Sequence, residues 1–216
     1  MVNYKITRKL NDFFETAEER IYRKGDIITF PHENPDGVMF LLEGLVEQYD
    51  LTPEGNKITV NIFKPMAFFP MSWAINRTPN VYFFAALTEV KLKRADPDKV
   101  AAFIQENPDV MFDLLSRVYT GIEGVLRRLV LAASGIASSR LIYELLLETY
   151  RFGDAKQGSK KSIKIKQSNL AARSGLARET VSRELHKLER EGVVELTKEG
   201  IVFEIGELEA RLDIDV

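Results

Sequence analysis

The sequence predicts an α+β protein with an N-terminal antiparallel β-roll of the jelly-roll type, a long dimerisation helix and a C-terminal winged helix-turn-helix. Short segments that alternate apolar and polar residues between turns are typical of a roll or barrel. A sustained heptad pattern indicates a helix that pairs with another helix. Two short helical patterns joined at a glycine and followed by a hairpin indicate a winged helix. We expect the roll over residues 1–106, the dimerisation helix and hinge over residues 107–136, and the winged helix over residues 137–216.

The composition excludes several classes of protein. Of the 216 residues, 45% are hydrophobic, which suffices for two domains with cores of their own. The absence of cysteine excludes disulfides, thiolate zinc sites and cysteine-ligated iron–sulfur clusters. Residues 1–20 lack the continuous apolar core of a signal peptide, and uncharged runs such as Pro65–Asn76 are far shorter than the ~20 residues of a membrane span. We therefore expect a cytoplasmic protein without a membrane partner.

The roll is expected within residues 21–95, where turn residues separate short apolar segments. Residues 58–62, Ile-Thr-Val-Asn-Ile, alternate with the period of two that a half-buried strand requires. The expected strands are Ile27–Phe30, Val38–Leu42, Leu45–Leu51, Ile58–Ile62, Val81–Ala86 and Val90–Lys93.

Aromatic residues concentrate in the second half of the roll. Seven aromatic side chains lie between Phe63 and Phe84, with Met66 and Met71 among them. Either they line a pocket for an apolar or flat ligand, since ligand pockets are mainly apolar, or they fill the interior of the roll and leave no cavity. The candidate effector-pocket residues are Phe68, Phe69, Met71, Trp73, Tyr82 and Phe84.

Catalytic and metal chemistry is not expected. The two histidines, His32 and His186, fall in different predicted domains and cannot form the clustered metal site that a cupin-like enzyme would use on a similar roll. We expect no catalytic residues, no metal and no resident cofactor, and leave the identity of any small-molecule effector open.

A long helix follows the roll. Asp96-Pro97 and Asn107-Pro108 each combine a capping side chain with a proline suited to a first helical turn. Apolar residues then recur at alternating intervals of four and three, which predicts a homodimer. The dimer seam comprises Met111, Leu115, Val118, Ile122, Val125 and Leu129, and a second apolar edge comprises Leu114, Leu126 and Val130.

Small residues interrupt this helix and follow it. Gly121 and Gly124 permit a close helix approach or a flexible joint, or are tolerated surface glycines. Ala132–Ser139 is expected to form a hinge before a helix that ends at Gly153. A polar loop over residues 156–161 and a strand over Ile163–Lys166 are expected next.

The C-terminal part predicts a helix-turn-helix. A helix is expected at Gln167–Arg173, a turn at Ser174–Leu176 and a second helix at about Arg178–Glu191, with Gly192 as its cap. Leu170 and Ala171 are expected to face a buried stripe of Val181, Leu185 and Leu188. A hairpin over Val193–Ile205 forms the wing, and the acidic residues 206–216 form a short helix or a frayed end.

The exposed face of the second helix predicts DNA reading. Arg178, Glu179 and Arg183 lie where a helix that enters the major groove presents side chains to base edges. An arginine fork matches guanine, and a carboxylate accepts from the amino group of cytosine. Residues 160–183 carry four lysines and three arginines against one acid, 7 − 1 = +6, in a chain of net charge −2. The candidate phosphate contacts are Lys164, Lys166, Gln167, Ser168, Thr180, Ser182 and Lys198. The alternative is an ordinary charged surface helix.

The motif Arg178–Arg183, Arg-Glu-Thr-Val-Ser-Arg, resembles that of the cyclic-AMP receptor branch of the Crp-Fnr superfamily of transcription regulators. The resemblance implies that Arg178, Glu179 and Arg183 read a TGTGA-like half-site of a palindromic operator, and that RNA polymerase is a partner. Landmarks of the family's cyclic-nucleotide-binding-like roll extend the resemblance over nearly the whole chain; they are Arg23–Ile28, Met39–Gly44 and Thr52–Lys57.

The sequence also departs from the family. Pro70 and Met71 stand where cyclic-nucleotide binders have a Gly-Glu pair that holds phosphate and ribose, and Arg77-Thr78 matches the following Arg-Ser only superficially. Ala177 replaces a Ser or Thr that caps the recognition helix. We therefore expect an effector other than cyclic AMP, either an apolar ligand or none. The alternatives are a cyclic-nucleotide-responsive regulator with a divergent pocket and a ligand-binding module that acts through protein partners.

Overall fold

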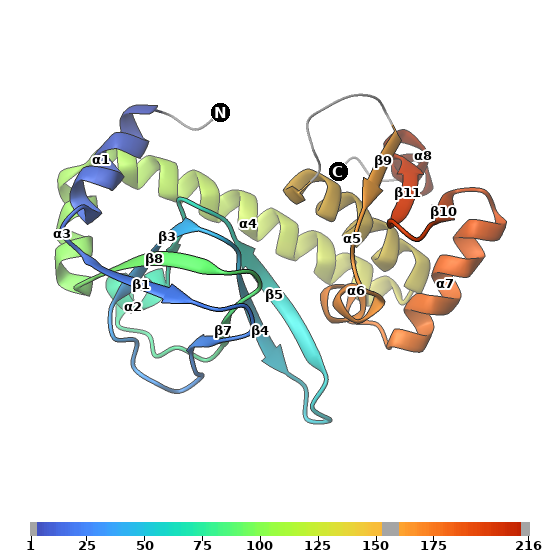
Figure 1. Cartoon of the computed structure of the whole chain (residues 1–216), viewed down its shortest axis with the longest axis horizontal. Helices are drawn as coiled ribbons and strands as arrows, with labels where there is room; N and C mark the ends of the chain where they lie inside the picture. Colours follow the sequence, from blue (N-terminus) through green and yellow to red (C-terminus); the bar gives the residue numbers. More distant parts are fainter. Residues whose placement is uncertain (1–3, 153–159, 213–216) are drawn as a thin grey trace. The chain divides into compact units, whose positions relative to one another are not determined.

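The computed structural model describes residues 4–152 and 160–212, and the chain divides into two compact units, Met1–Gly121 and Ile122–Val216 (Figure 1). The division falls inside the long helix α4, Pro108–Ser134, which contributes residues to both units. Among the described helices, none combines the length and the apolar composition that crossing a bilayer requires.

The first unit contains the antiparallel β-roll, which confirms that part of the predicted fold. Two four-stranded sheets have the orders β1-β8-β3-β6 and β2-β7-β4-β5. The strands are β1 Glu18–Tyr22, β2 Ile27–Thr29, β3 Val38–Glu43, β4 Val46–Leu51, β5 Lys57–Phe63, β6 Phe68–Phe69, β7 Phe83–Ala86 and β8 Val90–Ala95. Two boundaries differ from the prediction. The roll begins with β1 at Glu18, before the expected residue 21, and the strand expected from Val81 begins at Phe83. The short β6 has too few residues to show a period of two, so its pairing with β3 came only from the fold.

Two apolar cores lie in this unit. One core contains Phe69, Phe84 and Leu92. The other contains Phe40 and Phe68 together with residues of the helix α1, Tyr4–Phe14, which the sequence analysis did not anticipate. The buried residues of α1 are Ile6, Leu10 and Phe14, the i, i+4, i+8 positions of one helical face.

Three further helices begin in the first unit. They are α2 Met71–Asn76, α3 Pro97–Glu106 and the N-terminal part of α4. The Asp96 carboxylate accepts hydrogen bonds from the backbone amides of Asp98 and Lys99, so the expected cap of α3 is formed. Lys9 of α1 donates to both carboxylate oxygens of Asp109 at 2.7 and 2.9 Å, which fixes α1 to the start of α4.

The second unit is a winged helix-turn-helix, as predicted. Its elements after α4 are α5 Ala137–Phe152, β9 Lys160–Ile163, α6 Gln167–Ser174, α7 Arg178–Arg190, β10 Val194–Leu196, β11 Ile201–Glu204 and α8 Ile205–Leu212. The strands form one antiparallel sheet in the order β10-β11-β9. Its apolar core includes Leu141, Leu145, Leu170, Val181 and Phe203.

The structure corrects several boundaries in this unit. The strand expected at Ile163–Lys166 lies at Lys160–Ile163, because it pairs with β11 from Ile201 to Glu204. Ile205 begins α8 and is not part of the hairpin. The break between α4 and α5 is confined to Gly135, in the left-handed region at φ 70°, and Ile136, so most of the expected hinge is helical. Gly153 and residues 156–159 of the expected loop lie outside the described residues.

Candidate nucleic-acid interface

The turn of the helix-turn-helix is fixed by backbone geometry and by one arginine. Gly175 adopts φ 62°, and its N–H bonds to the carbonyl of Ala171, which ends α6. Arg140 of α5 donates to the Ser174 carbonyl at 2.9 and 2.6 Å and to the Gly175 carbonyl at 2.7 Å. A guanidinium at this helix C-terminus satisfies carbonyls that have no partner within the helix.

The helix α7 buries one face and exposes the other. Val181, Leu185 and Leu188 are buried in the core with Leu170, as the spacing predicted. Arg178, Glu179 and Arg183 are exposed, and the Arg183 side chain retains 70% of its accessible surface. The three candidate base-reading residues are therefore all exposed in the N-terminal half of α7, with Arg178 at its first position.

The N-terminus of α7 has no side-chain cap. Ala177 occupies the capping position with extended backbone, φ −65° and ψ 147°, and makes no side-chain bond to the first turn. The departure noted at this residue thus leaves amide donors of α7 without a side-chain oxygen.

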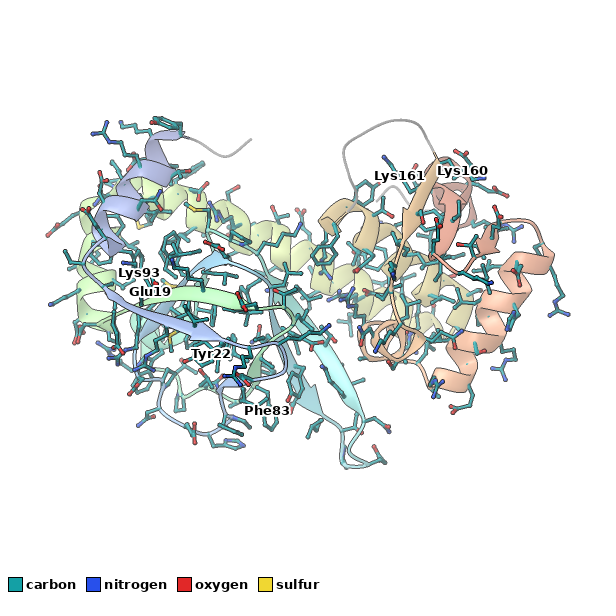
Figure 2. The ribbon with its side chains drawn as sticks, viewed as in Figure 1. Glu19, Tyr22, Phe83, Lys93, Lys160 and Lys161 are labelled. Atoms are coloured by element: carbon teal, nitrogen blue, oxygen red, sulfur yellow. The ribbon has the colours of Figure 1, made fainter. Side chains whose placement is uncertain are left out.

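The candidate phosphate contacts lie at three places on the second unit. Lys164, Lys166 and Ser168 are exposed before and at the start of α6, where the half-buried Gln167 also lies. Thr180 and Ser182 are on α7, and Lys198 is exposed at the turn of the wing. Gly200 shapes this turn, because a Cβ there would collide with the carbonyl oxygen of Ile163. Figure 2 marks Lys160 and Lys161 on β9; Lys160 lies 3.7 Å from Glu195, so part of its charge is offset.

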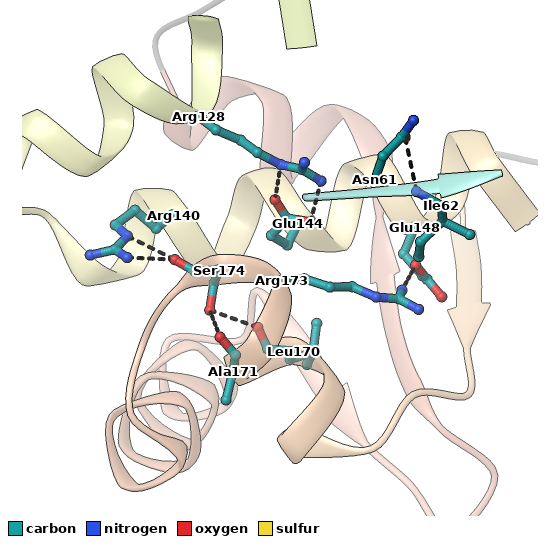
Figure 3. Close-up of polar contacts among 10 residues, drawn as sticks. All are labelled: Asn61, Ile62, Arg128, Arg140, Glu144, Glu148, Leu170, Ala171, Arg173 and Ser174. Atoms are coloured by element: carbon teal, nitrogen blue, oxygen red, sulfur yellow. Dashed lines mark hydrogen bonds and ion pairs between the residues drawn. The ribbon is translucent and has the colours of Figure 1, made fainter. Parts of the chain in front are cut away.

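Arg173 does not belong to this basic surface. Its side chain is buried and forms an ion pair with Glu148 of α5 (Figure 3). Burial raises the pKa of the Glu148 carboxyl, and the charge of Arg173 acts in the opposite direction. Counting Arg173 among the charges available to phosphate was wrong, because a charge count along the chain does not see which side chains face the core.

The seam of α4 is exposed to solvent in the single chain. Its six residues, named above, retain between 46% and 62% of their accessible surface. Phe112, Tyr119, Leu126 and Val130 are exposed on the same helix, whereas Leu114 packs against the core that contains α1. A Cβ at Gly121 or Gly124 would meet no atom within 4 Å, so the chain itself gives no steric reason for either glycine.

Comparisons with known proteins agree with both halves of this architecture. Residues 19–107 match the family model of the cyclic nucleotide-binding domain, and residues 139–210 match that of the Crp-like helix-turn-helix domain. The transcriptional regulator SdrP of Thermus thermophilus is 30% identical over 185 residues, covering 83% of this chain and 86% of that protein. The chain belongs to the Crp-Fnr family of transcription regulators.

Other known proteins are similar over most of the chain. The global nitrogen regulator of Synechocystis is 27% identical over 199 residues, covering 91% of this chain and 88% of that protein. A solved CRP/FNR-family transcriptional regulator from Thermus thermophilus has a TM-score of 0.74 at 25% identity, covering 91% of this chain and 99% of its own. The regulator CLP of Xanthomonas campestris, titled c-di-GMP responsive, has a TM-score of 0.79 at 14% identity, which shows the fold alone; 92% of this chain and 99% of that chain are covered.

The region that would hold a cyclic phosphate in a Crp-Fnr protein has other contacts here. Pro70 occupies the cap of α2 and makes no side-chain cap bond. Arg77 follows α2 in the left-handed region at φ 53°, forms an ion pair with Asp98 of α3, and lies 5.8 Å from the Trp73 ring centroid. Its guanidinium is thus engaged within the chain.

The candidate effector-pocket residues divide between two cores. Phe69 and Phe84 stack at 5.2 Å, and Phe63 lies 5.1 and 5.8 Å from these two rings. Phe68 faces the other core, 5.2 Å from Phe40, and Met71 packs against that core. Tyr82 packs against the core that contains Phe84, and Trp73 is half-buried near Arg77. The structure does not gather the six residues around one common space.

Two polar features were missed by sequence reasoning. Glu47 of β4 is 3% exposed, accepts a hydrogen bond from the Thr59 hydroxyl at 2.6 Å and pairs with Lys57. The second is a row of charged residues on α5, including Arg140 and Glu148. Only the spacing of four along α5 could have indicated the row, since its partners lie far away in the sequence.

Proposed function

We propose that the protein binds a palindromic, TGTGA-like operator as a homodimer and reads it with the N-terminal half of α7. The observation that carries the proposal is the exposure of Arg178, Glu179 and Arg183 in the first half of that helix. Within residues 4–152 and 160–212, neither Arg178 nor Glu179 forms an ion pair, and Arg183 has one long contact of 3.9 Å to Glu184. These side chains are therefore available to base edges.

The chemistry of the three residues suits a half-site that contains G·C pairs. An arginine fork can donate to both major-groove acceptors of guanine, and Glu179 can accept from the amino group of cytosine. Hydrogen bonds to DNA phosphates position a protein on the duplex without reading its sequence. The proposed phosphate contacts are Lys164, Lys166, Gln167, Ser168, Thr180, Ser182 and Lys198.

The exposed seam of α4 supports the homodimer. An apolar heptad face of this length is stabilised when a second helix covers it. Two copies of α7 about one helical turn of DNA apart then match the two halves of a palindrome. Membership of the family adds RNA polymerase as a proposed partner.

The proposed effector is not cyclic AMP. A relative from Mycobacterium tuberculosis, 22% identical, is named a cAMP-activated regulator. In this chain Pro70 supplies no amide donor, Met71 supplies no carboxylate and Arg77 pairs with Asp98. An apolar effector, or activity without an effector, fits these residues better.

The decisive experiment is a binding selection on random duplexes with the wild type, Arg178→Ala and the matched control Arg190→Ala. Arg190 is an arginine at the other end of α7. We expect Arg178→Ala to lose discrimination at one base pair of each half-site, by about 1–3 kcal/mol. Arg190→Ala should select the wild-type motif. If all three proteins enrich the same motif to the same extent, Arg178 does not read a base.

A further inference from the structure

Helix α5 carries a row of charged residues that the operator-reading model does not use. Arg140, Glu144 and Glu148 are spaced by four, so they lie on one face of the helix (Figure 3). Glu144 is 2% exposed and Glu148 is 9% exposed, within a helix whose other buried residues are mainly apolar. We name these three residues the α5 stripe.

The α5 stripe contacts α6 at two points. Arg140 donates to the carbonyls of Ser174 and Gly175, at the C-terminus of α6. Glu148 pairs with Arg173, whose side chain is buried. The Ser174 hydroxyl in turn donates to the Leu170 carbonyl at 2.7 Å, within α6 itself. These bonds fix both the turn and the last part of α6 against α5.

The middle of the stripe contacts α4. Arg128 donates to the two carboxylate oxygens of Glu144 at 2.7 and 3.2 Å, a two-point contact across the α4–α5 break. The stripe therefore joins the C-terminal half of α4 to the first helix of the helix-turn-helix motif, all within the second unit.

Buried ion pairs contribute little net stability, because the desolvation of both charges offsets their attraction. They are directional, however, whereas the hydrophobic effect is not. A forked arginine on a carboxylate or on carbonyl oxygens tolerates few orientations. The consequence of the α5 stripe is therefore a fixed position of α6, and through the short turn a fixed position of α7.

We propose that the α5 stripe is a positioning device that orients the helix-turn-helix motif on the end of α4, with Arg173 as a positioning residue and not a DNA contact. The proposal rests on the operator-reading function above. It assigns a role to buried residues that lie outside the exposed face of α7.

The test measures duplex affinity as a function of salt. The logarithm of the binding constant falls linearly with the logarithm of the salt concentration, and each lost phosphate contact makes this slope shallower by about 0.9. Misplacement of α7, in contrast, should lower affinity by the same factor at every salt concentration and leave the slope unchanged. The variants are Arg173→Met, Glu148→Met/Arg173→Met and Arg128→Met, with Lys166→Ala as the control for a lost phosphate contact. The duplex is the one that the wild type selects.

We expect Arg173→Met and Arg128→Met to lower affinity about fivefold or more with an unchanged slope, while Lys166→Ala lowers the slope. The double variant also removes the buried Glu148 carboxylate that Arg173→Met leaves without its ion-pair partner, so it regains thermal stability and keeps the wild-type slope. Arg173→Lys, which preserves the charge, should restore part of the affinity. A reduced slope in Arg173→Met and in the double variant would show that Arg173 contacts DNA, and unchanged affinity in Arg173→Met and Arg128→Met would show that the stripe does not position α7.

Amide hydrogen exchange without DNA gives an independent readout. Arg173→Met should lose protection in Gln167–Ser174, and Arg128→Met should lose protection around the α4–α5 break. If the wild type selects no duplex, the operator-reading proposal fails, and the exchange data still decide whether the stripe holds α6. Wild-type protection of α6 in Arg173→Met, together with wild-type protection of the α4–α5 break in Arg128→Met, would overturn the positioning proposal on its own.

Discussion

Among single residues, Ala177 lacks the side chain that would cap α7, and one substitution should supply it. Its backbone already has the extended conformation of a capping residue, and only the side-chain oxygen is missing. We expect Ala177→Ser to stabilise the second unit by ~1 kcal/mol, since a serine there can accept from the first-turn amides of α7. Urea denaturation monitored by circular dichroism measures the change.

The control for this substitution is Ala210→Ser, at an exposed interior position of α8. Serine is less favourable than alanine inside a helix, so this variant should lose a few tenths of a kcal/mol. Equal effects of the two substitutions would contradict the capping explanation.

Tyr150 provides a prediction about alkaline pH. Its hydroxyl donates to Glu209 of α8 at 2.5 Å, and this bond, with a smaller contribution from burial, raises the pKa of Tyr150 from 10.0 to about 12. Because the folded pKa is the higher one, the stabilisation is complete below pH 10 and is lost as the pH rises through about 12. We expect Tyr150→Phe to be less stable than the wild type below pH 10, with a difference that narrows toward pH 12. Unfolding curves of both proteins at successive pH values test this, and a constant difference would contradict it.

At the level of secondary-structure elements, α4 exposes an apolar seam that we expect a second copy of the helix to cover. A charge placed in the middle of the seam should prevent dimer formation, since an apolar interface cannot desolvate a carboxylate without a counter-charge. We expect Val118→Glu to be monomeric in analytical ultracentrifugation at concentrations where the wild type is dimeric.

The matched control is Ser116→Glu. Ser116 is exposed on the same helix but points away from the seam, because it lies about 140° around the helix from the seam's centre. This variant should remain dimeric. If both variants dimerise, the seam is not the interface; if both are monomeric, the effect comes from charge or helix stability in general.

At the scale of the whole molecule, the roll and the winged helix place this chain in a family with a cyclic nucleotide-binding domain, while the residues around α2 depart from that chemistry. We expect cyclic AMP to leave the thermal unfolding of the protein unchanged. A ligand present at about 100 times its dissociation constant would stabilise the fold by ~2.7 kcal/mol. A rise in melting temperature that grows with cyclic AMP concentration would show a divergent but functional nucleotide site.

The features that could be predicted from the sequence are those encoded by local periodicity. The stripe Val181, Leu185 and Leu188, the left-handed Gly192 and the cap Asp96 are each visible within a few residues, because helical period, turn geometry and capping act over one or two turns. The fold class and the family followed from such signals.

Which side chains meet could not be predicted from the sequence and became clear from the folded chain. Arg173 lies in a basic segment but is buried against Glu148, and Phe68 and Phe69 are neighbours in sequence that enter different cores. Helix α1 packs in one core with Phe40 and Val100, which are distant from it along the chain. The burial of a side chain and its ion pairs depend on residues that folding brings together from distant parts of the chain. A single sequence shows how apolar residues repeat along a segment, but it does not show which other segment packs against them.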